Sequence, residues 1–202
     1  MKKTILWDVD TQKDFMEPTG KLSVPGADKL KPNLKTLTRL GAEKARLCGS
    51  VDAHLPDDPE FKDWPPHCVY GTPGQHKIPE TLIEGTLYIP TAQLTEAQLM
   101  EAINYPGQVI FEKQDNDVRT NTNAIRFMEH IKPDLVIIYG VVTEICVNQA
   151  VEFIDGDLGL KAIIVLDAVK ELDQAQAMRC QTEWRKHGAE LLNTREVEKI
   201  LA

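Results

Sequence analysis

Short apolar runs alternate with longer amphipathic segments along most of this chain, and this alternation limits its possible folds more than any other feature. The run at 135–139, Leu-Val-Ile-Ile-Tyr, is apolar at every position. Such a run is typical of a strand in a parallel sheet that helices cover on both faces. Similar or weaker runs complete a set of predicted strands at residues 4–9, 45–51, 108–112, 135–139, 161–166 and 189–192.

The segments between these runs predict helices. Residues 28–41 place leucines near one face and end at Gly41, and residues 95–103 begin with the capping-box pattern of Thr95 and Gln98. The other predicted helices are residues 121–131, 143–154, 170–187 and 195–201. Strands that alternate with helices predict a three-layer α/β sandwich, with an open, mostly parallel sheet of about six strands flanked by helices.

The chain of 202 residues contains no repeat and no linker, so we expect residues 1–202 to form a single domain. One segment, residues 56–90, fits neither the strand nor the helix pattern and is rich in Pro, Gly, Asp and His. Irregular segments of this length inside a compact domain are usually functional. We therefore expect it to form one wall of a site.

Charge and cysteine content exclude several classes of function. The net charge of −8 argues against binding to nucleic acid or to an anionic membrane surface, both of which require clustered Lys and Arg. The four cysteines are scattered, which suits free thiols in a reducing compartment. Asp8 and Asp10 interrupt the first apolar run, so it does not resemble a secretion signal, and no run is long enough to span a membrane. We expect a cytoplasmic protein.

Chemically active side chains follow four of the predicted strands. The first strand ends at Asp10, the second leads into Asp52 and His54, the third ends at Lys113, and the fourth leads into Cys146. Ligands of open α/β sheets bind beyond the carboxyl ends of the strands. The sequence therefore predicts a site at this edge of the sheet.

Cys146 is the candidate nucleophile. If Thr143 caps the helix, Cys146 lies in its first turn, where free N–H groups and the helix dipole lower a thiol pKa and provide oxyanion donors. Lys113 would favour the thiolate, and Asp10 would accept or return a proton. The alternatives are a small buried helix residue for Cys146, a partner of backbone amides for Asp10 and a solvated edge residue for Lys113.

Asp52 and His54 are two residues apart in an extended segment, so their side chains point to the same side. His67 follows within the irregular segment, and one carboxylate with two imidazoles suits a divalent metal with open positions. Ordinary loop histidines are the alternative. The spacing does not place Glu60 or His76 as further ligands.

The chain opens with Trp-Asp-Val-Asp-Thr-Gln-Lys-Asp-Phe at 7–15, followed by Val-Pro-Gly-Ala at 24–27. This opening resembles the start of the isochorismatase-like cysteine hydrolases, with nicotinamidases as the most similar group. Asp-Ala-His at 52–54 and Trp-Pro-Pro-His-Cys-Val-Tyr-Gly-Thr-Pro-Gly at 64–74 resemble the nicotinamidase metal segment. Glu-Lys-Gln at 112–114 and Gly-Val-Val-Thr-Glu-Ile-Cys-Val at 140–147 resemble the lysine and cysteine motifs.

The resemblance implies an isochorismatase-like, Rossmann-like fold and a catalytic triad of Asp10, Lys113 and Cys146. It also implies a cis peptide bond between Val141 and Val142, with the backbone N–H groups of Val142 and Cys146 directed at the oxyanion.

The same resemblance suggests Asp52, His54 and His67 as the ligands of a metal, zinc first, with iron and manganese as alternatives. In nicotinamidases that metal holds the pyridine nitrogen of the substrate. Aromatic residues matching Phe15 and Trp64 flank the ring, so these two are expected to bind substrate.

The implied activity is hydrolysis of a small amide through a thioester, with conversion of nicotinamide to nicotinate and ammonia as the first candidate. An N-carbamoyl or ureido amidohydrolase is the main alternative, and isochorismate hydrolysis or a non-catalytic binding module are further ones. Family members commonly form homo-oligomers, so one is expected here.

Three departures from the nicotinamidase pattern bear on the substrate. Ala53 stands where an aromatic residue is usual, the segment between His54 and His67 is short, and residues 115–121 lack the usual aromatic residues. Arg119 in that last segment either selects an anionic substrate or faces solvent.

Overall fold

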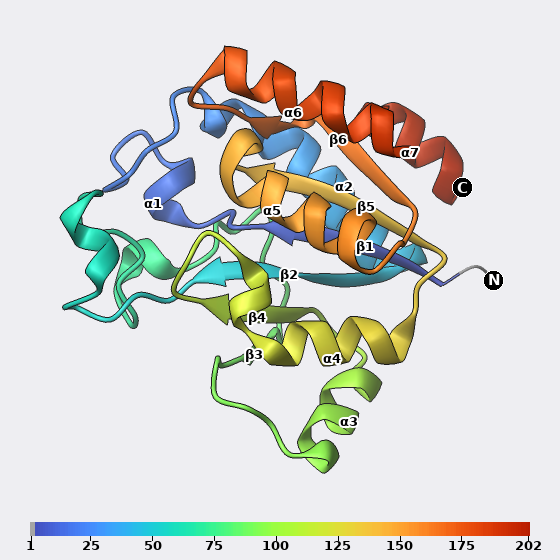
Figure 1. Ribbon diagram of the computed structural model, residues 1–202, viewed down its shortest axis with the longest axis horizontal. Helices are drawn as coiled ribbons and strands as arrows, with labels where there is room; N and C mark the ends of the chain where they lie inside the picture. The colour runs from blue at the N-terminus through green and yellow to red at the C-terminus, as the bar shows by residue number, and fades with distance from the viewer. Residues whose placement is uncertain (1–2) are drawn as a thin grey trace.

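The computed structural model describes residues 3–202, and Met1 and Lys2 of the expected domain lie outside it. The described chain contains a seven-stranded sheet in the order β3-β4-β2-β1-β5-β6-β7 (Figure 1). All pairings between these strands are parallel, which confirms the predicted parallel sheet. The strands are β1 (Thr4–Val9), β2 (Arg46–Asp52), β3 (Leu87–Ile89), β4 (Val109–Lys113), β5 (Leu135–Val141), β6 (Ala162–Lys170) and β7 (Glu190–Leu192).

The predicted count of about six strands is one short, because β3 lies within the segment 56–90 that the sequence pattern leaves irregular. β3 is only three residues long and forms the edge of the sheet, pairing with β4 alone. A segment this short shows no alternation of polar and apolar residues, so its pairing depends on β4 rather than on its own pattern.

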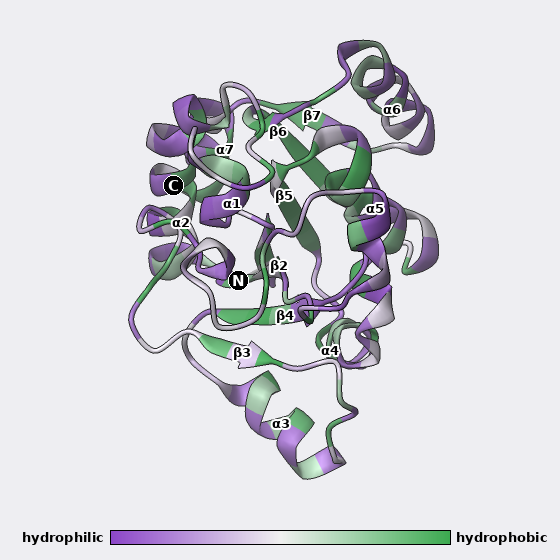
Figure 2. Cartoon of the chain, turned by 90° about the vertical axis from the view of Figure 1, so that its left-hand side faces the viewer, coloured by the Kyte–Doolittle hydropathy of each residue, from purple (hydrophilic) through white to green (hydrophobic). Residues whose placement is uncertain are grey.

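Helices cover both faces of the sheet, which confirms the three layers. In Figure 2 the strands form an apolar centre, with α2 and α7 on one side and α4, α5 and α6 on the other. The helices are α1 (Lys13–Met16), α2 (Lys31–Lys44), α3 (Glu96–Asn104), α4 (Thr122–Ile131), α5 (Asn148–Val151), α6 (Gln174–His187) and α7 (Thr194–Leu201). Short helical turns are η1 (Ala27–Leu30), η2 (Pro59–Lys62), η3 (Pro73–Gln75), η4 (Val118–Thr120), η5 (Thr143–Val147) and η6 (Glu152–Asp157).

Aromatic packing anchors the layer formed by α3–α6. The ring of Trp7 on β1 stacks on Phe111 of β4 at a centroid distance of 5.9 Å, and Phe127 of α4 meets Phe111 edge-on at 5.2 Å. These three side chains are fully buried. Burial of a large apolar side chain stabilises the fold by about 1.5–3 kcal/mol, so this cluster fixes α4 against the strands that carry the site.

Local capping explains where two helices begin. The predicted capping box at Thr95 is present, since its N–H donates to Gln98 Oε1 at 3.0 Å and its Oγ1 accepts from Gln98 N at 3.3 Å. The helix predicted from residue 170 begins at Gln174 instead. β6 continues through Lys170, and Asp173 then caps α6 by accepting from two backbone N–H groups.

No helix within residues 3–202 combines the length and apolar character needed to cross a membrane.

Candidate active site

Four strand ends meet at one edge of the sheet, on the left of Figure 1. β1 lies between β2 and β5, and Asp52 at the end of β2 is directly opposite Lys113 at the end of β4. The buried Lys113 ammonium forms ion pairs with the carboxylates of Asp10, at 2.9 Å, and of Asp52. Its Nζ also lies 3.7 Å from Cys146 Sγ. The Lys113 ammonium therefore contacts both other residues of the expected triad.

Asp10 immediately follows β1 and has a left-handed backbone, with φ of 51°. Its N–H donates to Ser50 O at 3.1 Å, and Ser50 Oγ donates to its Oδ1 at 2.8 Å. These two bonds leave Oδ2 facing Lys113. One carboxylate oxygen is thus fixed by β2, while the other is directed at the charged centre of the site.

Cys146 lies in the helical turn η5, directly after β5, and is buried. The peptide bond between Val141 and Val142 is cis, as the resemblance implies. The prediction that Thr143 caps this helix is wrong, because Val142 occupies the cap position and the buried Thr143 hydroxyl accepts no backbone bond there. The predicted helix 143–154 is present as η5, α5 and η6 in succession, so its first turn still lies at the sheet edge.

Burial and charged neighbours shift the pKa values of the three residues. Burial raises the pKa of the Cys146 thiol well above its usual value, opposed by the Lys113 ammonium and reinforced by the Asp10 carboxylate. This is opposite to the lowered pKa that the helix position predicts. Burial also raises the pKa of Asp10, and Asp52 adds to this. For Lys113 burial works against the charge, but Asp10 and Asp52 outweigh it and hold its pKa well above the usual range.

A small pocket, with a cavity volume of about 30 Å³, opens onto the thiol. Most of its lining residues are apolar, and its few charged or amide lining residues are Asp52, Glu60, His67 and Asn116, a composition typical of small-molecule sites. Both residues expected to bind substrate, Phe15 and Trp64, line it. The complete lining is Phe15, Leu22, Val24, Asp52, Glu60, Trp64, His67, Asn116, Val141, Val142, Ile145, Cys146 and Leu172.

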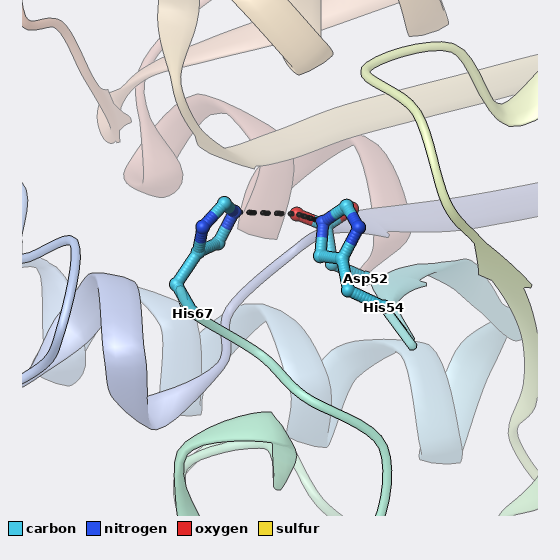
Figure 3. A group of neighbouring side chains, drawn as sticks. All are labelled: Asp52, His54 and His67. Atoms are coloured by element: carbon cyan, nitrogen blue, oxygen red, sulfur yellow. Dashed lines mark ion pairs between the residues drawn. The ribbon is translucent and has the colours of Figure 1, made fainter. Parts of the chain in front are cut away.

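The three residues expected to bind metal form a buried cluster beside this pocket. In Figure 3 both imidazoles face the Asp52 carboxylate. Its Oδ2 is 3.7 Å from His54 Nε2 and 3.8 Å from His67 Nε2, and one ligand atom from each residue lies within 4.8 Å of the others.

Backbone pairing explains how two distant histidines meet. His54 N–H donates to Cys68 O at 3.2 Å, and Tyr70 N–H donates to His54 O at 2.9 Å. This short parallel pairing lays residues 68–70 along residue 54. His67 is therefore placed beside His54 although twelve residues lie between them in the chain.

Contacts of the second ring nitrogens support a metal site. His54 Nδ1 is 3.0 Å from Asp58 Oδ2, and His67 Nδ1 is 2.9 Å from Pro65 O. Such acceptors hold each ring so that Nε2 is free for a metal. Within the described chain His54 Nε2 is buried and has no hydrogen-bond partner. Two ligands bound to zinc at tetrahedral geometry lie about 3.4 Å apart, so the observed spacing fits a divalent cation held by Asp52, His54 and His67.

Glu60 is a fourth candidate ligand that the sequence did not place. Its carboxylate oxygens lie 3.9 Å from His54 Nε2 and 3.7 Å from His67 Nε2. Asp58 caps η2 by accepting from Glu60 N at 3.0 Å, which fixes Glu60 in this position. Burial lowers the pKa of His54, but the carboxylates of Asp52, Asp58 and Glu60 outweigh it and raise that pKa to about 9. A cluster this negative favours a bound cation.

Two other residues left open by the sequence lie elsewhere. His76 lines a separate surface cleft with Tyr70 and Glu112. The Arg119 guanidinium donates to Asp117, Gln149 and Asp157, at distances of 2.6–2.9 Å, and does not line the pocket above Cys146. Its side chain is 26% exposed, so it faces solvent in part, and it ties its loop to the 143–157 helical segment.

The family model of the isochorismatase domain matches residues 90–196, which is more than half of the chain. The chain belongs to the isochorismatase family. It is therefore a hydrolase of that family. It is 26% identical over 196 residues to the nicotinamidase/pyrazinamidase of Mycobacterium tuberculosis, covering 91% of this chain and 95% of that protein. It is 28% identical over 200 residues to the nicotinamidase of Acinetobacter baylyi, covering 88% and 85%.

Solved structures share the fold of this isochorismatase-family chain. The pyrazinamidase of Pyrococcus horikoshii in complex with zinc has a TM-score of 0.74 at 26% identity, covering 95% of this chain and 99% of that one. The N-carbamoylsarcosine amidase of Thermoplasma acidophilum has a TM-score of 0.72 at 23% identity, covering 95% and 96%.

Proposed function

We propose that this hydrolase cleaves a small, uncharged amide and releases ammonia, with nicotinamide as the first substrate. One observation carries the proposal. The Cys146 thiol, in contact with Lys113, lies at a mostly apolar pocket whose other polar wall is the Asp52–His54–His67 cluster. A flat aromatic amide would thus have a nucleophile at one end and a metal site at the other. The nicotinamidases at 26% and 28% identity support the same substrate.

The proposed reaction begins with transfer of the thiol proton to Asp10, whose Oδ2 faces the site. The charge of Lys113, 3.7 Å from the sulfur, stabilises the thiolate as it forms. The thiolate attacks the amide carbon, and the backbone N–H groups of Val142 and Cys146 stabilise the developing oxyanion. Asp10 returns the proton to the departing ammonia, and water then hydrolyses the thioester. Because burial raises the pKa of the Cys146 thiol, Asp10 is needed in the first step.

Asp52, His54 and His67 would hold a divalent metal, zinc first, with the Glu60 carboxylate beside them. Bound there, the metal would supply a Lewis acid for a ring nitrogen or a water molecule. Phe15 and Trp64 both line the pocket and would exclude water from the ring of the substrate.

The charge of the pocket favours an uncharged substrate over an N-carbamoyl amino acid. Within residues 3–202 no Arg or Lys lines the pocket, whereas Asp52 and Glu60 do. Arg119 is held outside by its own carboxylate partners. Cleavage of an N-carbamoyl compound is the second candidate, supported by the shared fold of the N-carbamoylsarcosine amidase.

The test is ammonia release from nicotinamide by protein of known metal content, beside a panel of carbamoyl and ureido compounds. We expect release from nicotinamide that chelation abolishes and zinc restores, and no turnover by Cys146→Ala. Cys180→Ala is the matched control, because Cys180 lies on α6 outside the pocket and this variant should keep full activity. Turnover by Cys146→Ala would contradict the mechanism. Turnover of a carbamoyl compound alone would keep the triad and replace the substrate.

A further inference from the structure

An ion pair between Asp8 and Lys77 lies in the interior behind the catalytic residues. Lys77 Nζ is 2.8 Å from Asp8 Oδ2, and neither side chain is exposed. The proposed reaction does not use either group. A buried ion pair is often no more stabilising than apolar side chains of similar size. Stability alone is therefore a weak reason for its presence.

Both charged groups converge on the hydroxyl of Thr11. Lys77 Nζ donates to Thr11 Oγ1 at 2.8 Å, and Thr11 Oγ1 lies 3.0 Å from Asp8 Oδ2 and 2.7 Å from Thr81 Oγ1. All four side chains are buried. We call Asp8, Thr11, Lys77 and Thr81 the Thr11 network. It fixes one hydroxyl group from three directions.

Thr11 is the central residue of the tight turn that directs Asp10 into the site. Gln12 N–H donates to Asp10 O at 2.8 Å, which closes a three-residue turn around Thr11. Asp10 itself has φ of 51°, a conformation that side-chain-bearing residues adopt where their surroundings fix it. The Thr11 network supplies such a constraint one residue away from the carboxylate.

The same turn also reaches the backbone of Asp52. The Gln12 side chain donates to Asp52 O at 2.8 Å and accepts from Asp52 N at 2.7 Å. The segment that carries Lys77 pairs with this turn, since Ile78 N–H donates to Thr11 O at 3.0 Å. Both residues that pair with Lys113 are thus tied to this turn. Asp10 precedes Thr11 in the chain, and the backbone of Asp52 is hydrogen-bonded to Gln12, which follows Thr11.

We propose that Asp8 and Lys77 are positioning residues that act through the Thr11 hydroxyl. They hold the turn at residues 10–12 so that the Asp10 carboxylate faces Lys113 and the Cys146 thiol. This inference rests on the proposed function, because it assigns Asp10 a proton-transfer role. Apolar side chains in place of the pair would fill its volume but would not hold the hydroxyl.

Two variants test the proposal. Thr11→Val keeps the shape of the side chain and removes the hydroxyl, and Asp8→Leu/Lys77→Met replaces the pair by apolar groups. We expect each to lower kcat about 10- to 100-fold, because small displacements of a catalytic group have effects of this size, with KM changed less than about twofold. Alkylation of Cys146 should slow in parallel. Thr11→Ser, which keeps the hydroxyl, should retain wild-type kcat.

The matched control is Thr38→Val, at a buried threonine of α2 whose Oγ1 donates to Leu34 O at 2.9 Å. It should lose similar stability and keep its kcat. Wild-type kcat in Thr11→Val, with the fold intact by circular dichroism, would overturn the proposal even if the double variant does not fold. Asp10→Asn and Cys146→Ala are assayed beside these variants. Retained turnover in those two would refute the proposed function instead.

Discussion

Replacement of Asp52 by Asn should weaken two parts of the site at once, because its two carboxylate oxygens face different partners. Oδ1 accepts from Lys113, while Oδ2 faces His54 and His67. In metal-free protein the change replaces one of the two carboxylates that pair with the buried Lys113 ammonium by a neutral amide, which should lower the free energy of unfolding by about 1.5–3 kcal/mol. Loss of a metal ligand should also remove the stabilisation by zinc, about 2.7 kcal/mol at a zinc concentration of 100 Kd.

His67→Asn separates the two effects. The Asn amide can still donate to Pro65 O in place of His67 Nδ1, while the Nε2 that faces Asp52 is removed. In EDTA this variant should lose less than about 1 kcal/mol, because the hydrogen bond to Pro65 persists. With zinc it should lose the same 2.7 kcal/mol or so as Asp52→Asn.

Urea unfolding of the wild type and both variants, in EDTA and then with zinc, measures these terms, and metal analysis of the purified proteins accompanies it. Equal losses for the two variants in EDTA would refute the reasoning that Asp52 also stabilises Lys113. Full stabilisation of His67→Asn by zinc would refute its assignment as a ligand.

Three further predictions use other parts of the structure. The pKa of Asp10 is raised by burial above the ordinary 3.8, and only its ionised form accepts the thiol proton; kcat/KM should therefore rise with pH through an acidic limb above 3.8, whereas a limb at or below it would contradict this. Arg119→Ala should leave the ratio of kcat/KM for uncharged and anionic amides unchanged, since Arg119 does not line the pocket. A fall in kcat/KM for anionic amides alone would show instead that Arg119 selects anionic substrates. Gly140→Ala should lower the free energy of unfolding by about 3 kcal/mol in urea, because φ is 124° and a Cβ would lie 2.0 Å from Val9 O, while Gly156→Ala, with nothing within 4 Å, should lose far less.

The strand ends were predictable from the sequence for a simple physical reason. Runs that are apolar on both faces identify buried parallel strands, and parallel strands place their carboxyl ends at one edge. Asp10 and Lys113 follow or end such runs, and Cys146 lies a short turn beyond one. That geometry predicts that all three residues lie at the same edge of the sheet, and the observed order of the strands then brings them together.

Features that depend on long-range packing were not predictable in this way. β3 needs β4 beside it, and the protonation of Cys146 depends on how deeply the turn is buried. The helix position alone gives the opposite direction for the thiol pKa. Glu60 lies in the helical turn η2, and its only local signal is Asp58 before a proline, a pattern that marks the start of a helical turn but does not show where its side chains point.

Asp52 shows how a local and a long-range pattern combine in one residue. The local spacing Asp-Ala-His predicts that the carboxylate and the imidazole of His54 point to the same side of the chain. The parallel register then places Asp52 opposite Lys113, which no spacing within either segment reveals. The same carboxylate belongs to the metal cluster and to the ion pairs of Lys113. A metal bound at Asp52 would therefore partly neutralise the negative charge that also stabilises the Lys113 ammonium. Metal loading and thiol reactivity should therefore be coupled: zinc should change the alkylation rate of Cys146 in the wild type and leave it unchanged in His67→Asn.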